Sequence, residues 1–347
     1  MRGLMLETPI FSIVVVAFNS NDHLQGCLNH LAEQDFSAFE AIIVDNNCPQ
    51  GSTQNVSLPD GRFRVVSSTT NLGFAGGANL GADAASADWV VMLNPDTIVR
   101  PDWLHELHLA ILRFPQYSVF GSTILSMDDP TLIDSFGDVY SIYGVAWQGG
   151  HGASVEALPR EDKIVFGASG AAACYRRDVF RALRGFDERF FCYLEDVDLS
   201  FRLLNAGYNC LQVRKALVEH AGSVSSSGQE AFPILQTYRN GFRVIIKNAS
   251  LVSLPVLLVL HILTQSYIIL RNAKSPGTWA RLRGFVGGIG LILPCLLSRC
   301  RPRHDTLHQV IGISKLTAWR PKSLSDHTMV YRDVPQWSDA NDIIGNK

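Results

Sequence analysis

Positive charge is not in excess in this sequence. Its 30 Lys and Arg residues are balanced by 32 Asp and Glu residues, and the formal net charge is -2. Proteins that bind nucleic acid through its phosphates usually carry a clear basic surplus. The charge balance gives no electrostatic sign of such a partner, so we expect no nucleic-acid partner.

Closely spaced cysteine pairs are also missing. The chain has seven cysteines, an odd number, and no two are arranged as C-x-x-C. This pattern favours reduced thiols in a cytosolic protein over a disulfide framework or a zinc site. The N-terminus lacks a clear secretory signal, because Glu7 and Pro9 precede the first apolar run. We therefore expect the catalytic part of the chain to face the cytoplasm.

Two common phosphate-binding motifs do not occur. The stretch NLGFAGGANLG fits neither the G-x-x-x-x-G-K-[ST] loop nor the G-x-G-x-x-G dinucleotide fingerprint. The segment VVVAFNSNDHL also lacks the basic glycine-rich loop that a sugar nucleotidyltransferase would use to hold a triphosphate. The glycines of NLGFAGGANLG still permit close approach by a ligand, or tight packing of a helix on a sheet. We expect this stretch to be a loop that leads into an Ala-rich helix.

Apolar runs, by contrast, are abundant. Hydrophobic residues make up 47% of the chain and charged residues 18%, which supports a substantial core. Residues 10–18 form a β-branched run typical of a buried parallel strand. Further strand candidates end at Asp45, lie near Val65 and precede Asn94, with helical patterns between them. The sequence therefore predicts an α/β fold with a mostly parallel central sheet.

Polar residues stand where these predicted strands end. Ligands of parallel sheets bind beyond the carboxyl ends of the strands, which is where Asn19, Asp45 and Asp96 fall. Asp45 can accept hydrogen bonds from a nucleobase or ribose, and the alternative is a helix N-cap. Asp96, in LNPD, suits a hard divalent cation that keeps phosphate oxygens and waters as ligands. The alternative for Asp96 is a type I turn, which Asn-Pro-Asp-Thr also favours.

A second acidic group lies later in the chain. The segment FFCYLEDVDLSFRL places Glu195, Asp196 and Asp198 near the start of a predicted helix, where the helix dipole alone favours acids. The aromatic residues before them indicate a walled cleft, in which a carboxylate can act as general base for an attacking hydroxyl. His220, in EHAGS, becomes a candidate ligand only if it lies beside Asp96.

Taken in order, six motifs resemble the successive landmarks of family two of the glycosyltransferases: VVVAFNS, VDNN, NLGFAGGANLG, LNPD, GFDERFFCYLEDVDLSFRL and EHAGS. The similarity covers about residues 10–245. Within the family, the motifs look most like the rhamnosyltransferase-like branch that builds bacterial surface polysaccharides. The resemblance implies a GT-A fold, a nucleotide-sugar donor, a divalent cation (Mg²⁺ or Mn²⁺), and an inverting transfer to an acceptor hydroxyl.

The resemblance also implies roles for individual residues. Asp196 matches the proposed catalytic base, and Glu195 its neighbour that helps to position the acceptor. Asp96 matches the metal-binding aspartate of the D-x-D motif, whose first carboxylate is replaced here by Asn94. His220 matches a histidine that joins the metal shell in some relatives. The residues expected to bind the nucleotide are Phe18, Asn19, Asp45, Asn71, Gly73, Asn79, Asn94, Asp96 and Arg239, the last in a Tyr-Arg-Asn motif near the diphosphate.

The composition changes after Asn248. Residues 250–270 are uncharged and long enough to cross a bilayer, residues 284–298 form a shorter apolar run, and basic residues flank both. We expect in-plane or re-entrant helices that anchor the enzyme to anionic lipid. The alternative is a helical subdomain that packs on the core or forms a dimer.

The predicted organisation has three parts. Residues 125–166 are weakly patterned, and we expect a loop-rich excursion there with a hairpin. The parts are a GT-A domain over 1–245 (nucleotide-binding half 10–125, acceptor-binding half 126–245), apolar membrane-associated helices over 246–303, and a polar tail over 304–347.

The function predicted by these features is transfer of a sugar from a nucleotide-sugar to a glycan or lipid-linked acceptor. We expect it at the cytoplasmic face of the inner or plasma membrane, with the C-terminal region as a peripheral contact or anchor. The branch resemblance makes dTDP-rhamnose the leading donor. A UDP-hexose donor remains an alternative, because the residues that contact the sugar are not identifiable, and so does a non-catalytic membrane-associated subunit that kept the fold.

Overall fold

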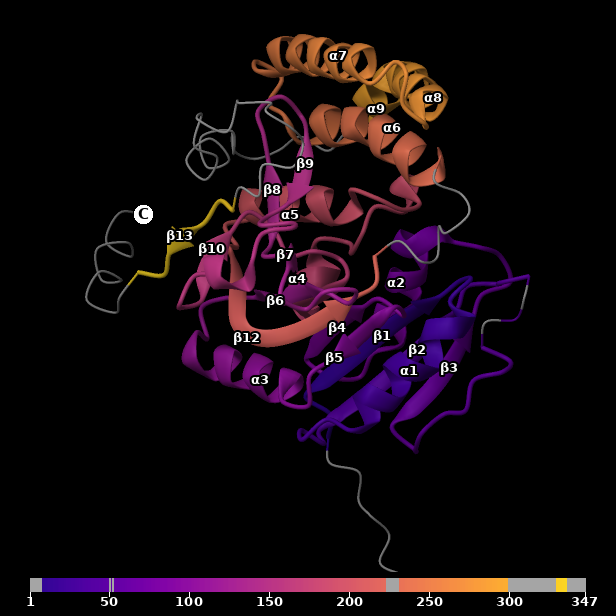
Figure 1. Ribbon diagram of the computed structural model, residues 1–347, viewed down its shortest axis with the longest axis vertical. Helices are drawn as coiled ribbons and strands as arrows, with labels where there is room; N and C mark the ends of the chain where they lie inside the picture. The colour runs from indigo at the N-terminus through magenta and orange to yellow at the C-terminus, as the bar shows by residue number, and fades with distance from the viewer. Residues whose placement is uncertain (1–7, 50, 52, 223–230, 299–328, 336–347) are drawn as a thin grey trace, which may run out of the picture.

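A mixed sheet runs through the molecule, and helices cover both of its faces (Figure 1). The computed structural model describes residues 8–49, 51, 53–222, 231–298 and 329–335. The first half contains β1 (Phe11–Ala17), α1 (Asn21–Ala32), β2 (Phe39–Asp45), β3 (Phe63–Ser67), α2 (Gly73–Ala84), β4 (Trp89–Leu93), β5 (Thr97–Val99) and α3 (Trp103–Arg113). The middle contains β6 (Val119–Ser126), β7 (Ile133–Ser135), β8 (Asp138–Tyr140), β9 (Ala146–Gln148), a 3-10 turn (Val155–Ala157), β10 (Lys163–Val165), β11 (Ala172–Arg176) and α4 (Arg177–Ala182). A second 3-10 turn (Glu188–Phe190), α5 (Glu195–Asn205), β12 (Cys210–His220), α6 (Ala231–Asn248), α7 (Leu254–Arg271), α8 (Thr278–Gly290), α9 (Ile292–Ser298) and β13 (Arg332–Asp333) follow.

The four predicted N-terminal strands form a parallel block in the order β3-β2-β1-β4. Every residue of β1 is buried, which fits its continuous apolar sequence, because both faces of a parallel sheet are covered by helices. The register pairs Ala17 with Asp45 and Val15 with Leu93. The loops that follow β1, β2 and β4 therefore leave the sheet at one edge, as the sequence predicted.

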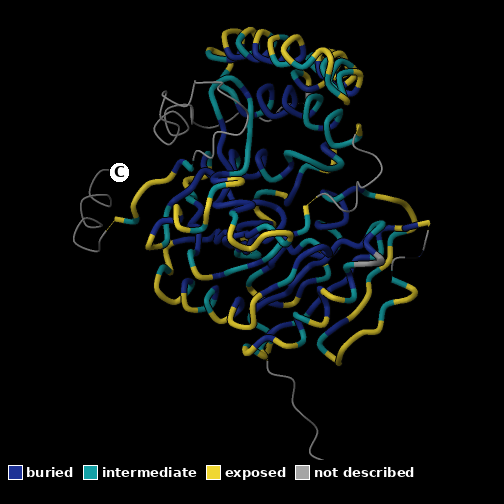
Figure 2. Tube along the Cα trace, viewed as in Figure 1, coloured by how far each residue is buried: buried dark blue, intermediate teal, exposed yellow. Residues whose placement is uncertain are grey.

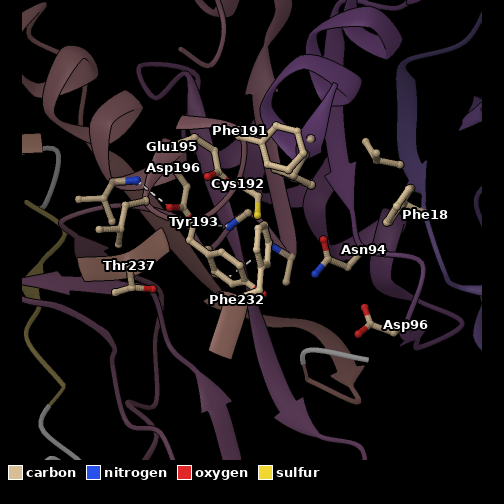
Figure 3. Close-up of a pocket in the computed structure, with 18 of the residues that line it drawn as sticks. Phe18, Asn94, Asp96, Phe191, Cys192, Tyr193, Glu195, Asp196, Phe232 and Thr237 are labelled. Carbon is tan, nitrogen blue, oxygen red and sulfur yellow. Dashed lines mark hydrogen bonds between the residues drawn. The ribbon is translucent and has the colours of Figure 1, made fainter. Parts of the chain in front are cut away.

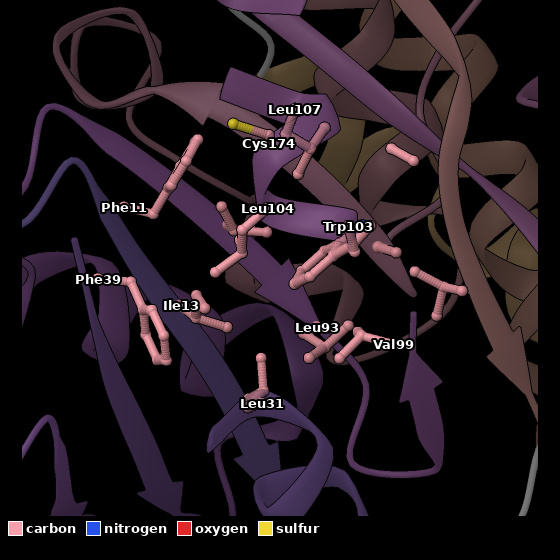
Figure 4. Close-up of a cluster of buried hydrophobic side chains, with 14 of the residues drawn as sticks. Phe11, Ile13, Leu31, Phe39, Leu93, Val99, Trp103, Leu104, Leu107 and Cys174 are labelled. Atoms are coloured by element: carbon pink, nitrogen blue, oxygen red, sulfur yellow. The ribbon is translucent and has the colours of Figure 1, made fainter. Parts of the chain in front are cut away.

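Two apolar layers hold this block. On one face, α1 and α3 bury Leu28, Leu31, Trp103 and Leu107 against strand residues such as Ile13 (Figure 4). The buried indole N–H of Trp103 donates a 2.9 Å hydrogen bond to Ser122 Oγ, so this large side chain is satisfied as well as packed. On the other face, α2 packs through small residues: Ala75, Ala78 and Ala82.

The glycine-rich stretch differs from its prediction. We expected a loop leading into a helix, but α2 already begins at Gly73 and contains the remaining glycines. Space explains their presence. A Cβ at Gly77 would lie 2.7 Å from Val16 Cγ1, and one at Gly81 would lie 2.3 Å from Val14 Cγ1. These glycines let α2 approach β1 closely.

The second half of the sheet brings distant segments beside the parallel block. β11 pairs antiparallel with both β4 and β6, and β12 runs parallel to β6. The last residues of β12 pair with β5, which sets His220 opposite Thr97. This pairing carries His220 next to the LNPD turn.

The weakly patterned segment contains the expected hairpin, β8–β9. Its tip includes Gly144, with φ of 78°. A Cβ there would lie 2.3 Å from Ile245 Cδ1 and 2.4 Å from His261 Nδ1. The hairpin tip therefore touches α6 and α7.

The helices α6 to α9 form a layer on the far side of α5 from the parallel block (Figure 1). The inner side of α7 is mixed: His261, Thr264 and Gln265 are buried there beside the apolar residues Leu254, Leu257 and Ile269. His261 Nδ1 lies 3.1 Å from the carbonyl oxygen of Tyr143. The outer side of α7 is apolar and exposed (Figure 2). Among the described residues, α7 is the one helix long and apolar enough to cross a membrane, and 33% of its 18-residue window is buried.

The predicted polar tail is described only in part. Within it, β13 adds antiparallel to β10 at the edge of the sheet. The rest of the predicted tail, and the basic residues Arg299, Arg301 and Arg303, lie outside the described residues.

Candidate active site

A pocket of about 870 Å³ opens at the carboxyl edge of the parallel block. It is large enough for a nucleotide-sugar, since small-molecule sites usually span about 300–1,000 Å³. Its wall includes nine residues predicted from the sequence: Phe18, Asn19, Asn71, Gly73, Asn94, Asp96, Glu195, Asp196 and His220. In Figure 3, Cys192, Tyr193 and Phe232 lie between the Glu195–Asp196 pair and Asp96.

Asp96 and His220 lie side by side, as the metal hypothesis required. His220 Nε2 is 3.4 Å from Asp96 Oδ1 and 3.3 Å from Asn94 Nδ2. On its other side, His220 Nδ1 is 2.9 Å from Oδ2 of Asp134, a buried residue that the sequence did not suggest. An acceptor on Nδ1 fixes which ring nitrogen faces the pocket, because Nδ1 then carries the hydrogen.

The charges around His220 are strongly coupled. Burial opposes the imidazolium, but the hydrogen bonds to Asp134 and Asp96 outweigh it and raise the pKa of His220 to about 9. Burial likewise opposes the charged form of Asp134, yet His151 and His220 lower the pKa of that carboxyl to about 2. The two carboxylates therefore favour the imidazolium form of His220, and a cation that binds at Nε2 would have to displace the proton there.

The turn before α2 is held by a buried asparagine, Asn46, of the VDNN motif. Asn46 Oδ1 accepts the N–H of Leu72 at 2.9 Å. Its Nδ2 donates to Asn71 Oδ1 at 3.1 Å and to the carbonyl of Gly73 at 3.0 Å. One side chain thus fixes the backbone of the predicted nucleotide loop.

The Glu195–Asp196 pair begins α5. Asp196 is partly exposed on the pocket wall, where its Oδ2 accepts the N–H of Gly170 at 3.0 Å and its Oδ1 the N–H of Val197 at 2.8 Å. Burial raises the pKa of Asp196 despite these hydrogen bonds. Burial and the neighbouring Asp196 raise the pKa of Glu195 well above its usual range. Asp196 is thus a stronger base than an aspartate in water.

Three predicted nucleotide contacts lie outside the pocket wall. Asp45 Oδ2 accepts the hydroxyl of Thr53 at 2.8 Å. The Asn79 amide is hydrogen-bonded to the backbone N–H and carbonyl of Phe186, so it joins α2 to the segment before α5. Arg239 packs toward Gly287 of α8, and a Cβ there would lie 3.6 Å from its Cδ. Their contact with a nucleotide stays a prediction.

Sequence reasoning missed several residues on the pocket wall. Trp147 of β9 and Phe232 and Thr237 of α6 all line it. β9 carries no motif, and the Tyr-Arg-Asn motif of α6 begins only after Thr237. β9 and α6 also meet only when the C-terminal layer folds over α5. No signal in the sequence alone identifies them.

With this geometry established, comparison with known proteins identifies the family. The sequence model of Glycosyl transferase family 2 matches residues 12–184, from β1 past α4. The chain belongs to this family. The family 2 chain is 29% identical over 236 residues to the N-acetylglucosaminyl-diphospho-decaprenol L-rhamnosyltransferase of Mycobacterium tuberculosis, an alignment covering 61% of this chain and 76% of that protein. It is 30% identical over 129 residues to the succinoglycan biosynthesis protein ExoO of Rhizobium meliloti, covering 36% of this chain and 37% of that one.

Solved structures share the architecture. S. aureus TarS residues 1–349 aligns with a TM-score of 0.52 at 13% identity, covering 82% of this chain and 80% of that one. GalNAc-T7 with UDP, GalNAc and Mn²⁺ aligns with a TM-score of 0.55 at 15% identity, covering 70% of this chain and 48% of that one. At such identities the likeness shows the fold alone, and it confirms the predicted GT-A fold. The match to the family model supports the predicted glycosyltransferase class.

Proposed function

We propose that this glycosyltransferase inverts the anomeric carbon of a nucleotide-linked sugar as it passes the sugar to an acceptor hydroxyl. The observation that carries the proposal is one pocket with two separate acidic groups. Asp96 with His220 forms one, and Glu195 with Asp196 forms the other. A displacement needs both a stabilised leaving group and a base for the nucleophile, and the two groups match these needs.

The donor end is Asp96 with His220. A carboxylate and an imidazole nitrogen 3.4 Å apart on the pocket edge fit a divalent cation that keeps diphosphate oxygens and waters as its other ligands. Across the described residues, no group of three or more His, Cys, Asp or Glu side chains is arranged to hold a metal alone. With Asp96 and His220 as its protein ligands, the site suits a cation that arrives with the nucleotide, Mg²⁺ or Mn²⁺. When bound, the cation neutralises charge that develops on the diphosphate.

At the acceptor end, Asp196 is the proposed general base. Its carboxylate takes the proton of the acceptor hydroxyl while the hydroxyl oxygen bonds to the anomeric carbon. The bond from that carbon to the diphosphate oxygen breaks, and the nucleoside diphosphate leaves from the opposite face. One displacement inverts the configuration and needs no nucleophilic side chain. Glu195, buried beside Asp196, positions the acceptor end.

The proposed donor is dTDP-rhamnose, because the M. tuberculosis relative is named as an L-rhamnosyltransferase. The name of that relative also gives its acceptor as a sugar diphosphate on a long isoprenoid, which supports a lipid-linked acceptor here. A UDP-hexose is the second candidate donor. A non-catalytic subunit is disfavoured, because both acidic groups are retained in one pocket.

Membrane contact through α7 to α9 completes the proposal. The outer side of α7 is apolar and exposed, whereas its buried side includes three polar residues, His261, Thr264 and Gln265. This helix therefore lacks the polar outer face of a helix that faces water. Large exposed apolar residues of this layer are Val256, Val259, Leu263, Leu270, Trp279, Val286, Leu293 and Leu297. Arg271, Lys274 and Arg283 are exposed nearby, where anionic headgroups would attract them. We place this face on the cytoplasmic surface of the membrane that holds the acceptor.

A pair of variants tests the division of roles. Asp196→Asn removes the base but keeps the side-chain shape, so we expect transfer to fall by about 10²–10⁴-fold with donor affinity unchanged. Asp96→Ala instead weakens cation-dependent donor binding. Calorimetric titration measures donor binding. Release of nucleoside diphosphate in the presence of lipid extract measures transfer. Wild-type turnover by Asp196→Asn would rule out the assigned base.

A further inference from the structure

The loop before the acidic pair has an unusual backbone. Phe191 has φ of 65° and ψ of -65°, and the N–H of Cys192 donates to the carbonyl of Phe190 at 2.8 Å. This is the rare γ-turn with positive φ at its centre. Tyr193 and Leu194, both with φ of 69°, follow in the left-handed region. Non-glycine residues keep such conformations only where their surroundings impose them.

On the donor side, the loop leans on the start of α2. The carbonyl of Phe191 accepts the N–H of Ala75 at 3.1 Å. The contact is close enough that a Cβ at Gly73 would lie 2.2 Å from the same oxygen. The backbone of Phe191 thus contacts the turn at the start of α2, which Asn46 contacts from the other side.

On the opposite side, one residue of α6 reaches three loop carbonyls. Asn240 Nδ2 lies 3.0 Å from the oxygen of Phe190, 3.0 Å from that of Cys192 and 2.8 Å from that of Tyr193. An amide nitrogen has two hydrogens, so the three acceptors share them. The three carbonyl oxygens fix the orientation of the Asn240 amide, because its Oδ1 would be repelled by them if it took the place of Nδ2.

Asn240 has no other visible task. It is fully buried, and its Oδ1 has no hydrogen-bond partner within the described ranges. The same face of α6 continues with Arg243 and Lys247, whose charged groups lie 5.4 and 5.2 Å from the ring centre of Phe190. The face of α6 therefore holds both ends of the γ-turn.

We propose that Asn240 is a positioning residue that holds the 190–194 loop in its γ-turn and left-handed form, and so places Asp196 for proton removal. Leu194 caps α5, and Asp196 lies in the first turn of that helix. A shift of the loop therefore moves the base. The inference rests on the proposed function in one respect, the role of Asp196. It makes α6 part of the catalytic machinery and not only the base of the apolar layer.

The test compares Asn240→Ala with Asn248→Ala. Asn248 is a matched control, because it is a buried asparagine of the same helix whose Nδ2 donates to Asp198 Oδ1 and Val244, not to the loop. Hydrogen exchange of the Cys192 and Ala75 amides reports the loop directly. We expect exchange at both amides to be about tenfold faster in Asn240→Ala and unchanged in Asn248→Ala.

Kinetics supply the second readout. The rate is measured from the nucleoside diphosphate that the donor releases, with lipid extract or water as acceptor. We expect the kcat of Asn240→Ala to be about 100-fold below that of the wild type. Donor affinity stays within about threefold, because Asn46 holds the nucleotide turn independently. Equal losses in the two variants, or unchanged exchange in Asn240→Ala, would overturn the proposal. If the wild type binds no donor, the proposed function fails, while the exchange result still decides the role of Asn240.

Discussion

At the scale of single residues, the site separates into what strand ends can predict and what they cannot. Asn19, Asn94 and Asp96 follow buried strands, so their place at one sheet edge could be foreseen from the apolar runs. Asp134 could not, because it contacts His220 across 86 positions of sequence and belongs to a segment without clear periodicity. The resemblance included Asn240 in the Tyr-Arg-Asn motif, but its contacts could not be foreseen, since its acceptors lie 47 to 50 positions away.

Asp134 gives a prediction at this scale. It accepts the Nδ1 hydrogen of His220, as carboxylates behind metal-binding histidines do. We expect Asp134→Asn to weaken Mn²⁺ affinity by about 10–100-fold, because the amide no longer fixes the ring with Nε2 toward Asp96. Electron paramagnetic resonance of Mn²⁺ with nucleoside diphosphate measures free and bound ion without needing turnover.

His151 provides the control for that measurement. His151 Nδ1 also lies 3.2 Å from Asp134 Oδ1, but the side chain of His151 is 65% exposed. We expect His151→Gln to leave Mn²⁺ affinity within about twofold, since solvent screens this contact. Equal affinities for wild type and Asp134→Asn would remove Asp134 from the site.

At the scale of elements, the hydrophobic periodicity predicted the strands and helices well. The role of the glycines in the glycine-rich stretch depends instead on how closely α2 packs on β1. The sequence allowed glycine for ligand approach or for close helix packing. The structure shows that Gly77 and Gly81 serve packing inside α2, whereas Gly73, with φ of 69°, serves the turn at its start. Composition alone cannot separate these uses, because each depends on what lies within 4 Å of the missing Cβ.

A pair of alanine substitutions tests this explanation. Gly81→Ala would place its Cβ 2.3 Å from Val14 Cγ1, so we expect a loss of about 1–3 kcal/mol in the free energy of unfolding. Gly26→Ala in α1 meets nothing within 4 Å, and we expect a gain of about 0.5–1 kcal/mol from helix propensity. Urea denaturation compares both with the wild type. Stabilisation by both substitutions would show that α2 does not need its close approach.

At the scale of the whole molecule, the chain is a sheet with its site at one edge and an apolar helical layer at one end (Figures 1 and 2). Composition predicted the apolar helices, and the structure adds their orientation, with polar residues inward on α7. The β8–β9 hairpin connects the two regions, since Trp147 lines the pocket while the hairpin tip touches α7. A lipid-linked acceptor could therefore keep its chain near the apolar layer while its sugar enters the pocket.

Vesicle binding tests the apolar face. Leu263 and Trp279 are 61% and 78% exposed on this layer, so Leu263→Glu with Trp279→Glu should abolish sedimentation with anionic vesicles. Leu112→Glu is the control, because Leu112 is 63% exposed on α3, away from the layer. Failure of the wild type to bind vesicles, together with loss of dimers in the double variant, would assign the face to contact between copies.

The most direct test of the central claim is calorimetric titration of the purified protein with dTDP-rhamnose, with and without Mn²⁺. UDP-hexoses serve as competing donors, and Asp96→Ala as the matched variant. The account predicts saturable binding that requires the cation and is weakened in Asp96→Ala, strongest for dTDP-rhamnose. Saturable binding of a UDP-hexose instead would keep the mechanism and change the donor. Absence of binding by every nucleotide-sugar, with folded protein and cation present, would contradict the account.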